Sequence, residues 1–236
     1  MFEEETMQCS GCIWVTGASS GIGRALCVRL SAEGQYVVGS SRDRQALFKL
    51  RAKLGDRFLP LPVDITSLSD LNDAVAEIER LAGPINLAIL NAGVYQPEGE
   101  NGFDGEQAHQ TINVNVLGTI NCLTAILPTM RQRRSGRIAL MASAAGYRGL
   151  PHAAGYGASR AAILSLAESL RFELEETGIA VQVITPGFVD TPLTAKNKFP
   201  MPFMITPDAA AHRILLGVRS DRFEITFPRR FTYVMK

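Results

Sequence analysis

The chain has 236 residues, is 46% hydrophobic, and carries 24 Lys and Arg against 23 Asp and Glu. That length allows one domain with a substantial core, and the balanced charge argues against a nucleic-acid partner, which needs a basic surplus or stripe. The acidic start, residues 1–5, lacks the basic and apolar parts of a secretory signal, and no run approaches the ~18 apolar residues of a membrane span, so we expect no integral membrane segment.

Seven short apolar runs alternate with helical patterns along the chain. The expected strands cover residues 12–16, 36–40, 58–63, 86–90, 137–141, 180–185 and 223–227. These runs are nearly continuous rather than alternating, which is typical of strands buried on both faces of a parallel sheet.

The segments between the strands have apolar residues at helical spacing. The expected helices cover residues 22–32, 43–54, 67–81, about 106–133, 154–177 and 207–218. Ser67 is placed as an N-cap, and Gly55 and Gly178 each follow the end of a helix. The alternation predicts an α/β protein with a Rossmann-type doubly wound parallel sheet of about seven strands, flanked by helices on both faces, in a single domain over residues 1–236.

Two clusters of residues have ordinary explanations. Cys9 and Cys12 form a C-x-x-C, but no second Cys or His pair has metal-site spacing, and the motif precedes the first strand. We therefore expect structural or incidental cysteines, no metal site, and a reducing, cytoplasmic location. The arginines between residues 131 and 137 are interpreted as a solvated helix end.

A glycine-rich turn, TGASSGIG at residues 16–23, lies between the first strand and the first helix. Gly17 permits a tight turn, Gly21 lets the backbone approach a pyrophosphate, and Gly23 lets the helix pack closely. The helix N-terminus then offers free N–H groups to phosphates. This pattern indicates a dinucleotide-binding site.

The spacing Gly-x-x-x-Gly-x-Gly and the later motifs resemble the short-chain dehydrogenase/reductase family, single-domain branch. These motifs are Asn91-Ala92-Gly93, Asn115, Ser143, Tyr156-Gly157-Ala158-Ser159-Arg160 and Pro186-Gly187. They occur in the family's order, with Ser143 and Tyr156 thirteen positions apart, and the resemblance covers nearly the whole chain. It implies an oxidoreductase that acts on the CH–OH group of its donor.

The resemblance also implies a set of cofactor-binding residues, at the C-terminal strand ends where open α/β sheets bind ligands. The set is Gly17, Ser19, Ser20, Gly21, Ile22, Gly23, Ser41, Arg42, Asp64, Ile65, Asn91, Ala92, Gly93, Tyr156, Arg160, Pro186, Gly187, Val189 and Thr191. Asp64 would contact the adenine amino group, with helix capping as the alternative. Residues 91–93 would approach the ribose, and residues 186–191 the nicotinamide.

The end of the second strand decides between NADP(H) and NAD(H). NAD enzymes usually place an acidic residue there, whereas this chain has Ser41 followed by Arg42, whose fork of donors suits a 2′-phosphate. Asp43 lies close by and leaves NAD(H) as the alternative. We expect NADP(H).

By the resemblance, four residues are catalytic: Asn115, Ser143, Tyr156 and Arg160. Tyr156 gives or removes the proton, Ser143 bonds the substrate oxygen, and the Asn115 backbone fixes a water in a proton relay. Arg160 stands where the family has lysine, so the motif is YxxxR. Its charge still favours tyrosinate, but arginine effectively never releases a proton. An altered but active enzyme and a catalytically weakened NADP(H)-binding sensor or interaction protein are both open.

The substrate evidence favours an apolar ketone or secondary alcohol. The expected wall consists of Val94, Tyr95, residues 147–152 and Phe188, with a lid at about 192–206 or, alternatively, an ordinary surface loop there. The longer sugar-nucleotide branch is disfavoured by length.

Two helices predict a homodimer or homotetramer, because in the family the helices that carry Asn115 and Tyr156 pack against a partner's. Their apolar residues at helical spacing are Val114, Leu117, Ile120, Leu123, Ile163, Leu166 and Leu170. Packing within the chain is the alternative use of these side chains. The last segment, residues 229–236, begins with two arginines and is expected to be a frayed end, with membrane-surface contact as the alternative.

Overall fold

A computed structural model describes residues 11–98, 102–197 and 199–236. Its strands are β1 (Cys12–Thr16), β2 (Val37–Ser41), β3 (Phe58–Pro62), β4 (Ile85–Leu90), β5 (Gly136–Met141), β6 (Ile179–Pro186) and β7 (Glu224–Phe227). They form one parallel sheet in the order β3-β2-β1-β4-β5-β6-β7. The order reverses between β1 and β4, so the chain proceeds outward from the middle of the sheet in both directions. The predicted doubly wound architecture is confirmed.

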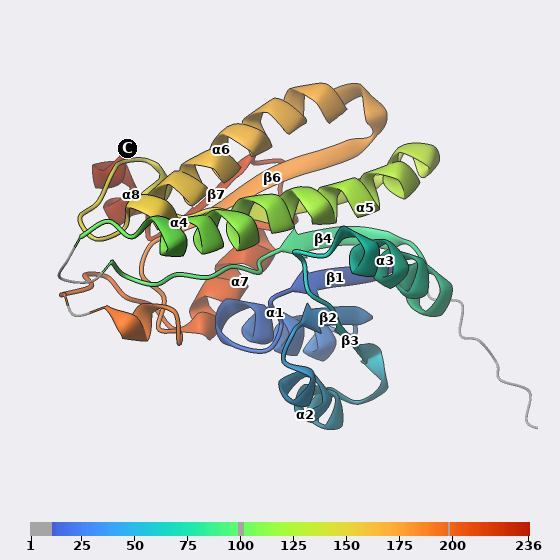
Figure 1. The fold of residues 1–236 in the computed structure, drawn as a ribbon. Helices are drawn as coiled ribbons and strands as arrows, with labels where there is room; N and C mark the ends of the chain where they lie inside the picture. The colour runs from blue at the N-terminus through green and yellow to red at the C-terminus, as the bar shows by residue number, and fades with distance from the viewer. Residues whose placement is uncertain (1–10, 99–101, 198) are drawn as a thin grey trace, which may run out of the picture.

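Helices cover both faces of this sheet (Figure 1). The helices are α1 (Gly21–Ala32), α2 (Arg44–Leu54), α3 (Leu68–Ala82), α4 (Gly105–Ile112), α5 (Gly118–Arg133), α6 (Ala154–Leu174), α7 (Pro207–Val218) and α8 (Arg229–Met235). Helices α1, α2 and α7 bury their apolar side chains on one face, and α3, α5 and α6 on the other. Because both faces are covered, the strands are apolar throughout, as the sequence indicates.

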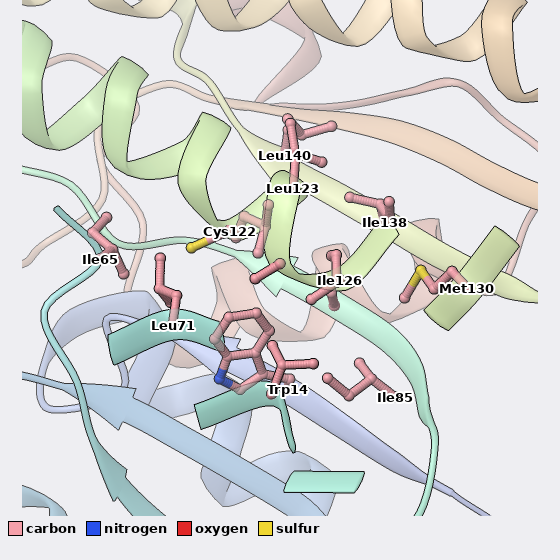
Figure 2. Packing of buried hydrophobic residues seen from close by; sticks show 14 of the residues in the cluster. Trp14, Ile65, Leu71, Ile85, Cys122, Leu123, Ile126, Met130, Ile138 and Leu140 are labelled. Atoms are coloured by element: carbon pink, nitrogen blue, oxygen red, sulfur yellow. The ribbon is translucent and has the colours of Figure 1, made fainter. Parts of the chain in front are cut away.

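The core between the sheet and α5 centres on Trp14, whose side chain is fully buried among aliphatic residues (Figure 2). Its indole Nε1 donates a hydrogen bond of 2.9 Å to the Ser40 hydroxyl on the neighbouring strand. Burial of a ring this large requires a partner for its one polar atom, and Ser40 supplies it. The side chains of Cys12, Cys27 and Cys122 are also buried, while Cys9 lies outside the described residues.

Local capping fixes most helix boundaries within a residue or two of the prediction. Asp43 accepts from the Ala46 N–H at the start of α2, and Ser67 accepts from the Asp70 N–H at the start of α3. Gly55 and Gly178 follow helical segments with φ of 74° and 77°, a backbone region that favours glycine.

The long helix expected at 106–133 is interrupted. Asp104 caps α4 through the N–H groups of Glu106 and Gln107, and a π-helical turn, Asn113–Leu117, joins α4 to α5. The stretch Gly105–Arg133 is long and apolar enough to cross a membrane by length and composition alone. In this fold, however, the α5 part contributes Leu123, Ile126 and Met130 to the core.

The expectation of a solvated helix end holds for Arg131 and Arg134, which are exposed. It is wrong for Arg133, which donates to the Ile85 carbonyl at 2.5 Å and pairs with Glu79 at 3.0 Å. The last segment is not frayed, because it forms α8, and Arg148 donates to the carbonyls of Met235 and Lys236. In both cases the hydrogen-bond partners are distant in the sequence and become neighbours only through the fold.

Candidate functional site

A cleft opens at the carboxyl ends of the strands, where the strand order reverses between β1 and β4. Its volume of about 370 Å3 falls in the range of small-molecule sites. The expected site residues that line it are Gly17, Ser19, Ser20, Gly21, Ile22, Ser41, Arg42, Asp64, Ile65, Asn91, Ala92, Gly93, Ser143, Tyr156, Arg160, Pro186, Gly187, Val189 and Thr191. Gly23 and Asn115 are buried behind this wall. The tertiary structure thus brings together nineteen of the twenty-one expected residues on one surface.

The glycine turn is held rigidly against the end of β4. Gly17 has φ of 69°, and a Cβ there would lie 2.9 Å from the Ala92 Cα. The Asn91 side chain donates to the Thr16 carbonyl at 3.0 Å, and the Ala92 N–H donates to the Thr16 hydroxyl at 3.0 Å. These contacts make glycine necessary at 17 and fix the turn at the floor of the cleft.

Gly23 acts in packing rather than by contact with the cleft. A Cβ at this position would lie 2.2 Å from the Gly17 carbonyl oxygen, so only glycine lets α1 approach the turn this closely. The N-terminus of α1 then faces the cleft through Ser20 and Gly21. In the described part of the chain the Ser20 side chain makes no capping hydrogen bond, and the first turn of α1 carries no acidic residue. These N–H groups are therefore available to an anion.

The end of β2 presents a mixed charge to the cleft. The Arg42 side chain is 67% exposed, and its Nη1 lies 3.9 Å from the Asp64 carboxylate. Asp64 also accepts from the Thr66 N–H and hydroxyl at 3.0 and 2.8 Å, while α3 is capped by Ser67. Asp43 is occupied as the cap of α2. The guanidinium is therefore only loosely held and can turn toward a bound anion.

Tyr156 lies in the first turn of α6, with its ring between an aromatic ring and a cation. The Tyr95 ring centroid is 4.7 Å away at an interplanar angle of 59°, and the Arg160 guanidinium carbon is 5.0 Å from the Tyr156 centroid. Both contacts favour one orientation of the ring. Burial raises the pKa of Tyr95, and the neighbouring Tyr156 and Glu98 add to this rise.

Arg160 is almost completely buried, with 3% of its surface exposed. Its Nη1 donates to the Met141 carbonyl at 2.8 Å, and a Cβ on Gly93 would lie 2.3 Å from its Nη2. Its Nε has no hydrogen-bond partner among the described residues. The guanidinium thus fills the space between the ends of β4 and β5 while one edge lines the cleft. A buried cation with a free donor indicates a site built for a further acceptor.

Asn115 occupies the π-helical turn between α4 and α5. Its side chain accepts from the Val94 N–H at 2.8 Å and donates to the Val94 carbonyl and the Ser159 hydroxyl, both at 3.0 Å. Its backbone carbonyl accepts from the Thr119 hydroxyl at 2.8 Å. The side chain therefore ties the loop after β4 to α6, a role that the sequence did not indicate.

Ser143 lines the cleft at the end of β5, and its hydroxyl accepts from the Ala145 N–H at 3.2 Å. Tyr147, which we expected in the substrate wall, does not line this cleft. Its hydroxyl donates to Glu224 and Thr185 instead, and the Lys236 ammonium binds the same carboxylate. Burial opposes the charge on Glu224, but the bonds from Lys236 and Tyr147 hold its pKa below the usual range. The fold therefore uses Tyr147 to anchor the loop that follows Ser143.

Glu98 was missed by the sequence reasoning. Its carboxylate accepts from the N–H groups of Ala154 and Gly155 at 2.9 and 3.4 Å, and its own N–H donates to the His152 carbonyl at 3.0 Å. Ala153, at the N-cap of α6, has no side chain that can cap. A residue 56 positions away thus caps the helix that carries Tyr156. The only signal in the sequence was a helix start without a capping residue.

The expected lid segment, 192–206, starts at the rim of the cleft with Pro192, Leu193 and Thr194. Its base is closed by a parallel bridge between Val189 and Ile205. Further along, the Phe199 ring packs edge-on against Phe188 at 6.0 Å. Residue 198 lies outside the described residues.

The geometry defines a class: an open parallel α/β sheet with a ligand cleft at its switch point and a free helix N-terminus in that cleft. A sequence profile described as short chain dehydrogenase matches residues 11–200. An uncharacterized oxidoreductase from Myxococcus xanthus (strain DK1622) is 36% identical over 217 residues, which cover 91% of this chain and 86% of the relative. The chain therefore belongs to the short-chain dehydrogenase family and is an oxidoreductase of that type.

Solved structures agree with this assignment. A short-chain dehydrogenase from Sphingobium yanoikuyae, in complex with NADPH, superposes with a TM-score of 0.83 at 27% identity, over 95% of this chain and 92% of that one. One from Burkholderia cenocepacia J2315, in complex with NADP, has the same TM-score at 26% identity and covers 95% of this chain and 91% of that one.

In the described part of the chain, no group of three His, Cys, Asp or Glu side chains is arranged to hold a metal ion.

Proposed function

We propose that this protein is an NADP(H)-dependent oxidoreductase that transfers a hydride between nicotinamide and an apolar ketone or secondary alcohol. The observation that carries the proposal is the position of Tyr156 and Ser143 on the wall of the cleft whose floor is the α1 N-terminus. One cleft thus combines an anion-binding end with a proton donor.

The residues present fit a dinucleotide. Gly17 and Gly21 have positive φ, and near Gly21 a Cβ would meet only the Thr191 side chain, so the backbone is open toward the cleft. The free N–H groups of α1 suit a pyrophosphate, and Arg42 suits a 2′-phosphate. Two similar solved structures, from Burkholderia cenocepacia J2315 and Sphingobium yanoikuyae, are in complex with NADP or NADPH, which supports the same choice here.

The bound nicotinamide would supply or accept the hydride. In carbonyl reduction, the Tyr156 hydroxyl donates a proton to the substrate oxygen, while the Ser143 hydroxyl donates a hydrogen bond to it and stabilises the developing charge. The Arg160 guanidinium lies over the Tyr156 ring and places a positive charge beside it. Arg160 also lines the cleft, where its guanidinium could donate to the cofactor ribose.

A second function is favoured by one observation. Arg160 is anchored to the Met141 carbonyl and cannot release a proton, so a relay that needs that step would stall. The protein would then be an NADP(H)-binding sensor or interaction protein with little turnover. We favour the enzyme because Tyr156 and Ser143 both stay accessible in the cleft.

A screen of NADPH oxidation against ketones and aldehydes, run beside an NADPH titration, tests the two functions. We expect turnover with an apolar carbonyl substrate and tighter binding of NADPH than NADH. Tight NADPH binding with no turnover over the whole panel would favour the sensor, and no binding of either cofactor would contradict both proposals.

We also propose a homodimer or homotetramer. Of the apolar residues expected at the interface, Leu123, Ile163 and Leu170 are buried in the chain's own core, whereas Leu117 in the π-helical turn and Ile120 on α5 remain exposed. Phe172 on α6 adds a side chain that is 74% exposed. Exposed apolar residues on these helices suit a partner subunit. A monomer mass by light scattering at micromolar concentration would refute this proposal.

A further inference from the structure

We propose that Tyr95 is a positioning residue that couples the segment 192–206 to the ring of Tyr156. The proposal rests on the proposed function, because positioning matters only if Tyr156 transfers the proton. Tyr95 follows β4 and is 7% exposed, and no residue of the glycine turn or of the YxxxR motif lies beside it in the sequence.

The backbone on either side of Tyr95 is fixed by side chains from distant elements. Both the N–H and the carbonyl of Val94 bond to the Asn115 side chain, at 2.8 and 3.0 Å. The carbonyl of Gln96 accepts from the Gln107 side chain. Because the residues before and after Tyr95 are both hydrogen-bonded, the backbone of Tyr95 has little freedom, and its ring is held in one position.

That ring lies against the ring of Tyr156. The centroids are 4.7 Å apart and the planes are tilted by 59°, a separation and tilt at which aromatic rings attract. The Arg160 guanidinium stands 5.0 Å from the Tyr156 centroid. If the Tyr95 ring were absent, the Tyr156 ring would lose one of these two contacts and would be less restricted.

The carbonyl of Tyr95 itself is bonded by the segment that begins at the rim of the cleft. The ammonium of Lys196 donates to this oxygen at 2.9 Å, across 101 positions of sequence. Lys196 lies in the short 3-10 turn Thr194–Lys196, directly after Pro192, Leu193 and Thr194 at the cleft. A change in the position of this segment therefore reaches Tyr156 through a single residue.

Two kinds of variant separate the two contacts of Tyr95. Tyr95→Ala removes the ring and should lower kcat by ~10–100-fold, the effect of a small misplacement of a reacting group, with a smaller change in KM. Tyr95→Phe keeps the ring and should restore near-native kcat. Lys196→Met should lower kcat by ~2–10-fold, as for one ordinary hydrogen bond, because the segment no longer holds the Tyr95 backbone. Lys49→Met, an exposed lysine on α2, is the matched control.

Measurements without turnover keep this proposal separate from the proposed function. Nitration of Tyr156 by tetranitromethane, followed by peptide mass spectrometry, should be faster in Tyr95→Ala than in Tyr95→Phe or the native protein, with nitration of Tyr147 unchanged. Amide hydrogen exchange in residues 192–197 and 199–206 should be faster in Lys196→Met but not in Lys49→Met.

Each outcome supports or overturns one part of the argument. A Tyr95→Phe variant as slow as Tyr95→Ala would assign the effect to the hydroxyl and overturn the positioning role. Native nitration of Tyr156 in Tyr95→Ala would do the same even in a protein with no measurable activity. Unchanged exchange in Lys196→Met would break the link to the segment 192–206. Absence of turnover in the native protein, with the nitration and exchange effects of the variants as expected, would contradict the proposed function alone.

Discussion

At the nucleotide end of the cleft, the expected phosphate-binding turn is one continuous stretch, residues 16–23. Asn91 and Ala92, just after the neighbouring strand β4, hold it in place. The surroundings of Tyr156 are assembled differently. They come from the loop after β4, the π-helical turn before α5, the end of β5 and α6. The first end depends on backbone conformation, and the second on side chains that meet across long sequence separations.

This difference decides how each end responds to substitution. A substitution at Gly17 or Gly23 would place a Cβ against backbone atoms, and movement of a side chain could not relieve that clash. The tyrosine end has several supports, namely Tyr95, Arg160 and Glu98, each of which can be removed separately. We therefore expect substitutions around Tyr156 to cause graded losses of activity.

Tyr156→Phe should have the largest effect. The ring and its contacts with Tyr95 and Arg160 remain, but the proton donor is gone, so turnover should fall by ~10²–10⁴-fold, the usual contribution of a general acid. NADPH affinity, measured by fluorescence titration, should change little, because the N–H groups of α1 and Arg42 are untouched. Turnover within a few fold of native would mean that another group supplies the proton.

Arg160→Ala should be the next most severe. It removes the charge beside Tyr156 and the hydrogen bond to the Met141 carbonyl, so kcat in carbonyl reduction should fall by ~10–150-fold, the scale of a lost hydrogen bond to a charged group.

Arg160→Lys is the matched variant for this position. It keeps the charge and adds a group able to release a proton, so it should retain or raise activity. An Arg160→Ala variant with the kcat of the native protein would show that Arg160 has no catalytic role.

Arg42→Ala tests the nucleotide end. It should weaken NADPH binding by ~1.5–3 kcal/mol and leave NADH binding nearly unchanged, because only NADPH carries the 2′-phosphate. Arg44→Ala is the matched control, since Arg44 lies over the Phe48 ring at 5.3 Å on α2. Equal losses for the two cofactors, by isothermal titration, would contradict the NADP(H) assignment.

Glu98→Ala should have the smallest effect of the four. Loss of the cap on α6 should lower the free energy of unfolding by about 1 kcal/mol, visible as a lower Tm, with a modest fall in kcat. Glu98→Gln keeps an acceptor for the Ala154 N–H and should recover most of the loss. Glu173→Ala, an exposed glutamate on the same helix, should leave Tm nearly unchanged. If it lowered Tm as much as Glu98→Ala, the capping explanation would be wrong.

The fold and the nucleotide cradle could be read from the sequence because their signals are local. Apolar runs, helix caps such as Ser67 and the glycine turn each act within a few residues, and the structure follows them closely. The contacts of Arg133, Tyr147 and Glu98 could not be read, because their partners at positions 85, 224 and 154 become neighbours only after folding.

The sequence by itself determined the alternation of strands and helices, the family and the residues that would gather at the strand ends. The tertiary structure alone decided that Tyr156 lies between Tyr95 and Arg160, and that Lys196 reaches the Tyr95 carbonyl. The physical reason is that backbone conformation is set by neighbours in the chain, whereas side-chain contacts depend on which faces the packed sheet and helices bring together.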